Sequence, residues 1–180
     1  MPFPVQDLKM MKESFAAAAD EARLRSLFNE KICRNEGKGL DLLGEGTHFR
    51  AFRLRDASGG DLVIKRALPH FAGGPGSPGR RAWQRALDAL RPLVATTPLL
   101  APWLVIEEGD ELGLATPYGP EPALVAAARW QPLAEARVAL TASLKRAGLE
   151  IADQLQLRCR NGVPFVIDLS DLRRLAPGSL

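Results

Sequence analysis

Residues 42–65 read LLGEGTHFRAFRLRDASGGDLVIK, and this stretch is the most informative part of the 180-residue chain. It begins with an apolar-alternating segment that carries Gly44 and Gly46, and a turn cluster at 56–60 separates it from a second strand-like run that ends on Lys65. This pattern predicts a β-hairpin. A glycine-tipped hairpin followed by a strand with a lone lysine can cover the phosphates of a nucleotide, because the backbone offers N–H donors and the ammonium offers a positive charge.

The composition is that of a globular protein. Hydrophobic residues make up 46% of the chain and charged residues 25%, so the chain can bury a core as one domain or as two small lobes. The net charge is only +3, and the basic residues are mostly arginine, which favours planar recognition of phosphate or carboxylate. Nucleic acid is not an expected partner, because no compact Lys/Arg run with interleaved aromatic residues occurs.

The chain has two cysteines, Cys33 and Cys159, and two histidines, His48 and His70. Their spacing gives neither a disulfide framework nor a metal-ligand pattern, so the cysteines are expected to be reduced, buried thiols. The N-terminal residues 1–15 carry charges where a signal peptide needs an apolar run. No segment approaches the roughly 20 apolar residues that span a bilayer. These features predict a cytoplasmic protein without a transmembrane segment.

The first half of the chain alternates between helical and strand patterns. Apolar residues at three- and four-residue steps predict a helix over about 5–36, which either packs on its own domain or recruits a protein partner or a membrane surface. Residues 69–79 hold so many Pro and Gly that a loop is expected there. A helix is predicted over 80–94, with arginines on one face. Its apolar face consists of Trp83, Ala86, Leu87 and Leu90.

The second half is predicted to contain strands at 103–107 and 111–115, and then a turn-rich boundary between lobes at 118–122. An alanine-rich helical region follows at about 122–147, and two strand-like runs around Asn161-Gly162 predict another hairpin. The expected fold class is α+β. Its predicted parts are an N-terminal helical extension (1–39), a lobe with an antiparallel sheet (40–118) and a mainly helical lobe (119–180).

The order of these features resembles that of the protein-kinase-like superfamily. Gly44-Glu45-Gly46 matches the Gly-rich loop, Val63-Ile64-Lys65 the strand with the phosphate-contacting lysine, and Ile167-Asp168-Leu169 the motif with the metal-binding aspartate. The resemblance covers roughly residues 40–172. Within the superfamily, the chain resembles lipopolysaccharide-core sugar kinases and related small bacterial proteins. The resemblance implies a two-lobed fold whose second, mainly helical lobe is truncated relative to the family. It also implies that the chain binds ATP through Gly44, Gly46, Lys65 and the hinge residue Thr116, with Mg²⁺ held by Asp168.

Two departures concern the nucleotide half of this pattern. The position of the third loop glycine holds Phe49. The family's helix after the lysine carries a glutamate that pairs with it, but residues 80–91 contain none, and Asp88 or Gln84 is the nearest candidate. A lysine without this partner loses its preorganised position, which costs catalysis more than binding.

Other departures concern the catalytic half. Counting back from Asp168 places the family's base near Leu149 and its metal-binding asparagine near Gln154, and neither residue fits. Glu150 or Asp153 could act as the base instead, although both also fit solvated loop carboxylates. Asp168 is either a ligand for Mg²⁺, a hard cation that prefers carboxylates, or a cap for the segment that follows.

Three functions remain open from the sequence. The first is an ATP-dependent phosphotransferase to a hydroxyl of a sugar or other small molecule, with Lys65 on the phosphates, Asp168 on Mg²⁺, and Asp153 or Glu150 at the acceptor. The second is an inactive pseudokinase that acts as a binding or regulatory module. The third is a non-kinase α+β protein whose basic helix, from Arg80 to Arg91, binds a partner or nucleic acid.

Overall fold

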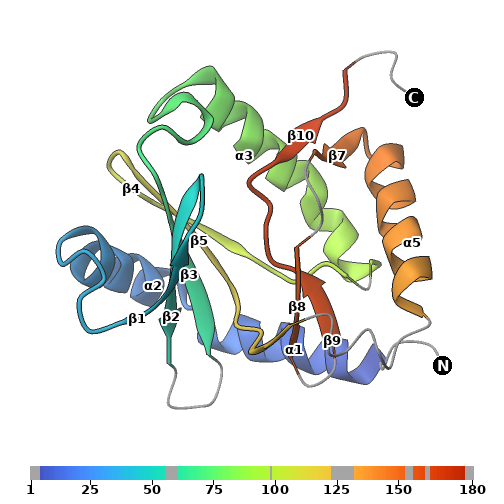
Figure 1. Ribbon diagram of the computed structural model, residues 1–180, viewed down its shortest axis with the longest axis horizontal. Helices are drawn as coiled ribbons and strands as arrows, with labels where there is room; N and C mark the ends of the chain where they lie inside the picture. Colours follow the sequence, from blue (N-terminus) through green and yellow to red (C-terminus); the bar gives the residue numbers. More distant parts are fainter. Residues whose placement is uncertain are drawn as a thin grey trace. The chain divides into compact units, whose positions relative to one another are not determined.

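The computed structural model describes residues 5–55, 61–97, 99–122, 132–152, 156–160 and 163–176. The fold class is α+β, as predicted (Figure 1). The chain divides into two compact units. The sheet unit comprises Met10–Arg80 and Pro102–Tyr118, and the hairpin unit comprises Met1–Lys9, Arg81–Ala101 and Gly119–Leu180.

The sheet unit contains a five-stranded antiparallel sheet in the order β1-β2-β3-β5-β4. The predicted hairpin of residues 49–54 and 62–64 is β2 and β3, and the strands predicted at 103–107 and 111–115 are β4 and β5, so these predictions are confirmed. The strands are β1 (Asp41–Glu45), β2 (Phe49–Leu54), β3 (Leu62–Ala67), β4 (Leu104–Glu108) and β5 (Glu111–Pro117).

The sequence predicted one helix up to about residue 36. The structure instead has three successive helical pieces in this segment. These are α1 (Val5–Ala18), α2 (Glu21–Leu27) and a π-helical turn, Phe28–Cys33. The break falls at Asp20, whose backbone is extended and whose carboxylate accepts a hydrogen bond of 2.7 Å from the Arg23 N–H. An aspartate in this position caps a new helix, which explains why the first one stops although the apolar pattern continues.

The core of the sheet unit lies between these helical segments and one face of the sheet (Figure 1). Gly113 of β5 allows the Phe28 ring to approach the sheet, because a Cβ there would lie 2.7 Å from the ring. Residues 10–39 therefore belong to the same compact unit as the strands. The largest residues of this core are Phe15, Leu24, Phe28, Ile32, Phe52, Leu62, Ile64 and Ile106.

Helix α3 (Pro78–Leu90) begins inside the segment predicted to be a loop. Ser77 caps it, since the Ser77 Oγ accepts a hydrogen bond of 3.1 Å from the Arg80 N–H. The loop before it contains a 3₁₀ turn at Phe71–Gly73, and a second 3₁₀ turn, Arg91–Ala95, follows the helix. The predicted apolar face is confirmed, because Trp83, Ala86, Leu87 and Leu90 are all buried.

The hairpin unit combines most of α3 with α5 (Pro132–Arg146) and short strands. The predicted hairpin is β8 (Leu157–Arg160) with β9 (Val163–Val166), and the Asn161-Gly162 turn lies outside the described residues. A helix was expected from about residue 122, and α5 begins at Pro132. Residues 123–131 lie outside the described residues. The sequence did not predict three further strands. β6 (Glu121–Pro122) pairs with β8. β7 (Leu149–Ile151) pairs with β10 (Leu172–Arg174) (Figure 1).

Both cysteines are free thiols, with Cys159 buried and Cys33 half-buried. None of the described helices has the length and apolar character needed to cross a membrane.

Candidate functional site

The strand register places three of the four predicted nucleotide-binding residues on one face of the sheet. Lys65 lies opposite Ala51 of β2, and Ala51 lies opposite Gly44 of β1. Thr116 of β5 lies opposite Val63 of β3. Residues that pair directly across antiparallel strands share a face, and residues two apart on one strand also share it. Gly44, Lys65 and Thr116 therefore lie on the same face, which we call the lysine face.

The lysine face is not the one that forms the hydrophobic core. Leu62 and Ile64, which alternate with Val63 and Lys65 along β3, belong to that core and point toward the helices. Lys65 is nevertheless only 9% exposed, and Thr116 only 5%. Charged side chains are rarely buried unless they meet an opposite charge or hydrogen-bonding groups. Lys65 takes part in an interaction within the protein, and its positive charge lies on the same face as Gly44 and Thr116.

The two predicted glycines lie where β1 meets the turn into β2, and both are exposed. The register shifts between Leu42 and Gly44, so a β-bulge falls next to the first glycine, whose φ is +156°. A Cβ on Gly44 would meet nothing within 4 Å. The Gly46 N–H donates a hydrogen bond of 2.9 Å to the Phe49 carbonyl oxygen and closes the turn. Open space beside the backbone allows a ligand to approach it.

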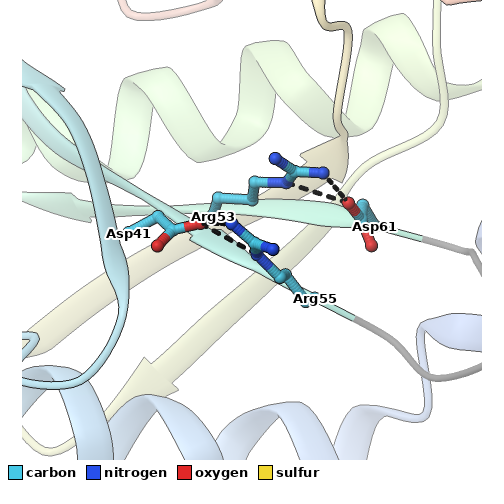
Figure 2. A network of polar contacts seen from close by, with 4 residues as sticks. All are labelled: Asp41, Arg53, Arg55 and Asp61. Carbon is cyan, nitrogen blue, oxygen red and sulfur yellow. Dashed lines mark hydrogen bonds and ion pairs between the residues drawn. The ribbon is translucent and has the colours of Figure 1, made fainter.

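A network of two arginines and two aspartates lies on the strand ends near Thr116 (Figure 2). Arg55 donates hydrogen bonds of 3.0 and 2.8 Å to the Asp41 carboxylate, and Arg53 donates to Asp61, from Nε at 2.9 Å. The Arg53 guanidinium also stacks on the Tyr118 ring, 4.2 Å from its centroid. The hydrogen bond to Asp61 raises the pKa of Arg53.

This network fixes the end of β5 that leads out of the sheet unit. The Tyr118 N–H donates a hydrogen bond of 3.1 Å to the Asp61 carbonyl oxygen, so both the backbone and the side chain of Tyr118 are held. These residues were not predicted from the sequence. The available signal is the alternation of Arg53 and Arg55 at the end of β2, which places both on one face.

Asp168 belongs to the hairpin unit and follows β9. Its Oδ1 accepts a hydrogen bond of 2.9 Å from the Ser170 N–H, which is the capping role that the sequence left open. The same turn is held by the Trp83 indole, which donates to the Leu169 carbonyl oxygen at 2.7 Å. Among the described residues, no group of three or more His, Cys, Asp or Glu side chains is placed to hold a metal ion. A metal role for Asp168 remains a prediction.

Of the two candidate bases, only Glu150 lies within the described residues, whereas Asp153 falls in the gap at 153–155. Glu150 lies on β7 directly opposite Arg173 of β10. Its Oε1 accepts a hydrogen bond of 2.7 Å from the Arg173 Nε. The Glu150 carboxylate therefore takes part in a cross-strand ion pair, which is a structural role.

The basic helix has fewer available arginines than its sequence indicates. Arg80 is only 7% exposed, and its guanidinium donates a hydrogen bond of 3.0 Å to the Asp110 carbonyl oxygen in the β4–β5 turn. Arg81, Arg85 and Arg91 are exposed. Arg80 therefore joins the start of α3 to the β4–β5 turn and contributes little exposed charge to the helix.

Comparisons with known proteins assign no family to the chain: no family model matches it, and no curated protein matches its sequence significantly. The proposed function therefore rests on the geometry of the site. The structure brings Gly44, Lys65 and Thr116 onto one face of one sheet, with Gly46 in the adjoining turn, while Glu150 and Asp168 belong to the other unit.

Proposed function

We propose that this chain binds the phosphates of a nucleotide, with ATP as the first candidate, on the lysine face of the sheet unit. One observation carries the proposal: Gly44, Lys65 and Thr116 come from three different strands and lie on one face. The buried ammonium supplies a positive charge for phosphate. The exposed backbone at Gly44 leaves room for a phosphate to approach, because a Cβ there would meet nothing within 4 Å.

The order of elements also supports a kinase-like function. A glycine hairpin, a strand with a lysine, a helix and two further strands follow one another in β1–β2, β3, α3 and β4–β5. The resemblance to the protein-kinase-like superfamily implies this order. In that family Mg²⁺ accompanies ATP and neutralises phosphate charge, and the residue of this chain proposed to hold it is Asp168, a carboxylate that suits a hard cation.

Binding without phosphotransfer is the form of this function that the described residues favour. Glu150, one of the two candidate bases, is engaged by Arg173. Helix α3 contains no glutamate, the residue that the resemblance implies as the partner of Lys65. Phosphotransfer to a sugar or small-molecule hydroxyl, with Asp153 at the acceptor, is therefore the second candidate.

Ligand-induced thermal stabilisation tests the binding proposal. We expect Mg·ATP to raise the melting temperature of the wild type, since a ligand at 100 times its Kd stabilises a protein by about 2.7 kcal/mol. Lys65→Ala should abolish the shift. Lys38→Ala removes an exposed lysine of the same unit and should leave the shift intact. An unshifted wild type, or a Lys65→Ala variant that shifts equally, would overturn the proposal.

Two further measurements divide the kinase-like alternatives. Asp168→Ala should weaken ATP binding only when Mg²⁺ is present, if Asp168 holds the metal. ATP consumption is then followed with a panel of sugars and small alcohols. We expect no ATP consumption with any of these acceptors. ATP consumption by the wild type that is lost in Asp153→Asn would establish phosphotransfer instead.

A further inference from the structure

The segment that follows β3 reaches back to the glycine turn, residues 46–48. The His70 Nε2 lies 2.7 Å from the Thr47 carbonyl oxygen. Because a carbonyl oxygen only accepts, the ring nitrogen must donate this hydrogen bond. The Leu68 N–H donates a second hydrogen bond, of 2.8 Å, to the His48 carbonyl oxygen. The turn is thus bonded to the stretch of chain that directly follows the lysine strand.

Aromatic contacts reinforce this attachment. Phe71 is only 2% exposed, and its ring centroid lies 4.7 Å from that of Phe49 and 5.6 Å from that of His48. The rings are tilted at 50° and 60°, within the range that aromatic pairs prefer. The His48 and His70 rings lie 6.4 Å apart. Residues 68–71 therefore contact Thr47, His48 and Phe49, the part of the turn that leads into β2.

We propose that His70 is a positioning residue that fixes the glycine turn relative to the lysine strand. A turn that contains glycine has wide conformational freedom and would lose entropy on closing over a ligand. The hydrogen bond from His70 removes part of that freedom before any ligand arrives. His70 acts through the backbone of Thr47 and does not need to touch the ligand. The effect on nucleotide affinity rests on the proposed function, whereas the fixing of the turn does not.

Amide hydrogen exchange tests the positioning role without a ligand. In His70→Ala we expect the Gly46 and Leu68 amides to exchange about fivefold faster than in the wild type, the change expected for one lost hydrogen bond. His70→Gln retains a side-chain N–H donor and should restore much of the protection. Thr47→Ala is the matched control, because the acceptor is the main-chain carbonyl and the variant keeps it. Equal exchange in His70→Ala and the wild type, or equal acceleration in Thr47→Ala, would overturn the positioning role.

Affinity for Mg·ATP, measured by titration calorimetry, tests the consequence for binding. His70→Ala should raise Kd about fivefold, and His70→Gln should stay within about twofold of the wild type. Faster exchange with an unchanged Kd would show that the turn does not contribute to nucleotide binding and would overturn that part of the proposal. A wild type that binds no nucleotide would refute the proposed function, while the exchange data would still decide whether His70 holds the turn.

Discussion

The indole N–H of Trp83 donates a hydrogen bond of 2.7 Å to the carbonyl oxygen of Leu169, and both residues are only 4% exposed. The bond joins α3 to the turn that contains Asp168. A buried carbonyl that loses its donor costs about 1–3 kcal/mol, because no water replaces the donor. The Trp83 side chain therefore holds the Asp168 turn in addition to filling the core.

Trp83→Phe removes the donor and keeps an aromatic ring in the core. We expect it to lower the free energy of unfolding by about 2 kcal/mol, from the unsatisfied carbonyl and the smaller ring together. Urea denaturation measures this change. Val138→Ala, at a helix position that is 70% exposed, is the control and should change the free energy by less than about 0.5 kcal/mol. A Trp83→Phe variant as stable as this control would contradict the role assigned to the hydrogen bond.

Helical periodicity was sufficient to predict that Trp83 is buried, but not to identify its partner. A 3.6-residue period fixes which face of a helix is apolar, whereas Leu169 lies on a distant stretch of chain. The strand predictions succeeded for a similar reason, because alternation and turn residues are local signals. Once β2, β3 and β5 pair in register, that local information places Lys65 and Thr116 on one face.

The failures also have physical causes. The helix break at Asp20 was missed because the apolar spacing continues through it, while a single capping hydrogen bond decides the backbone. Arg80 was counted with a solvent-facing basic surface, yet its guanidinium finds an acceptor, the Asp110 carbonyl, in the β4–β5 turn. In both cases one polar contact decides the local structure, and the periodicity of apolar and charged residues does not reveal that contact.

Gly37 and Gly39 have similar φ angles but differ in the space around them. Alanine substitutions at the two positions therefore separate the cost of a steric clash from the cost of a strained backbone. Gly37 has φ of +77° and Gly39 has φ of +84°, so alanine is strained at both positions. A Cβ on Gly37 would lie 2.0 Å from the ring of Phe52, whereas a Cβ on Gly39 would meet nothing within 4 Å. Phe52 is buried and cannot move aside without disturbing the core.

We therefore expect Gly39→Ala to destabilise the protein by about 1–2 kcal/mol, the cost of a left-handed alanine. Gly37→Ala should cost about 1–3 kcal/mol more, the range for overpacking a core. Both values come from urea denaturation under the same conditions. Equal destabilisation by the two variants would show that the Phe52 contact has no energetic effect.

Stability at acid pH should depend on Glu111. Arg66 donates hydrogen bonds of 2.9 and 2.8 Å to the two Glu111 oxygens, and these bonds lower the pKa of Glu111 from its ordinary 4.5. A carboxylate with a lowered pKa in the folded state contributes stability above its unfolded pKa, and this contribution is lost as pH falls through the folded pKa. Because the pair is partly exposed, we expect about 1 kcal/mol or less.

Glu111→Gln removes this dependence. At pH 7 the variant should be less stable than the wild type, and the difference should shrink once the pH falls below about 4.5 and vanish at the acid end of the titration. Urea denaturation at a series of pH values measures the difference, with the exposed Glu135→Gln as the control. A difference that stays constant down to pH 3 would mean that the pair does not titrate as proposed.

The thiol of Cys33 should be unreactive although it is only half-buried. Burial foremost, and then the negative charge of Glu111, raises the pKa of Cys33 from 9.0 to about 11. The thiolate is the nucleophile, and at pH 8 its fraction is about a hundredfold smaller in the folded than in the unfolded chain. Because a more basic thiolate is also about tenfold more nucleophilic, the reaction with a disulfide reagent should be about tenfold slower in the folded chain. Cys159→Ala leaves Cys33 as the only thiol and makes its rate measurable on its own.

The same raised pKa predicts a loss of stability at alkaline pH. A thiol whose folded pKa lies above its unfolded value contributes stability that is complete below the unfolded pKa and is lost as pH rises through the folded pKa. The wild type should therefore lose stability between about pH 9 and pH 11, and Cys33→Ser should lose less over the same range. Denaturation of both proteins across this range measures the effect. Identical pH profiles, or a folded Cys33 that reacts as fast as the unfolded one, would show that burial does not hold the proton on this thiol.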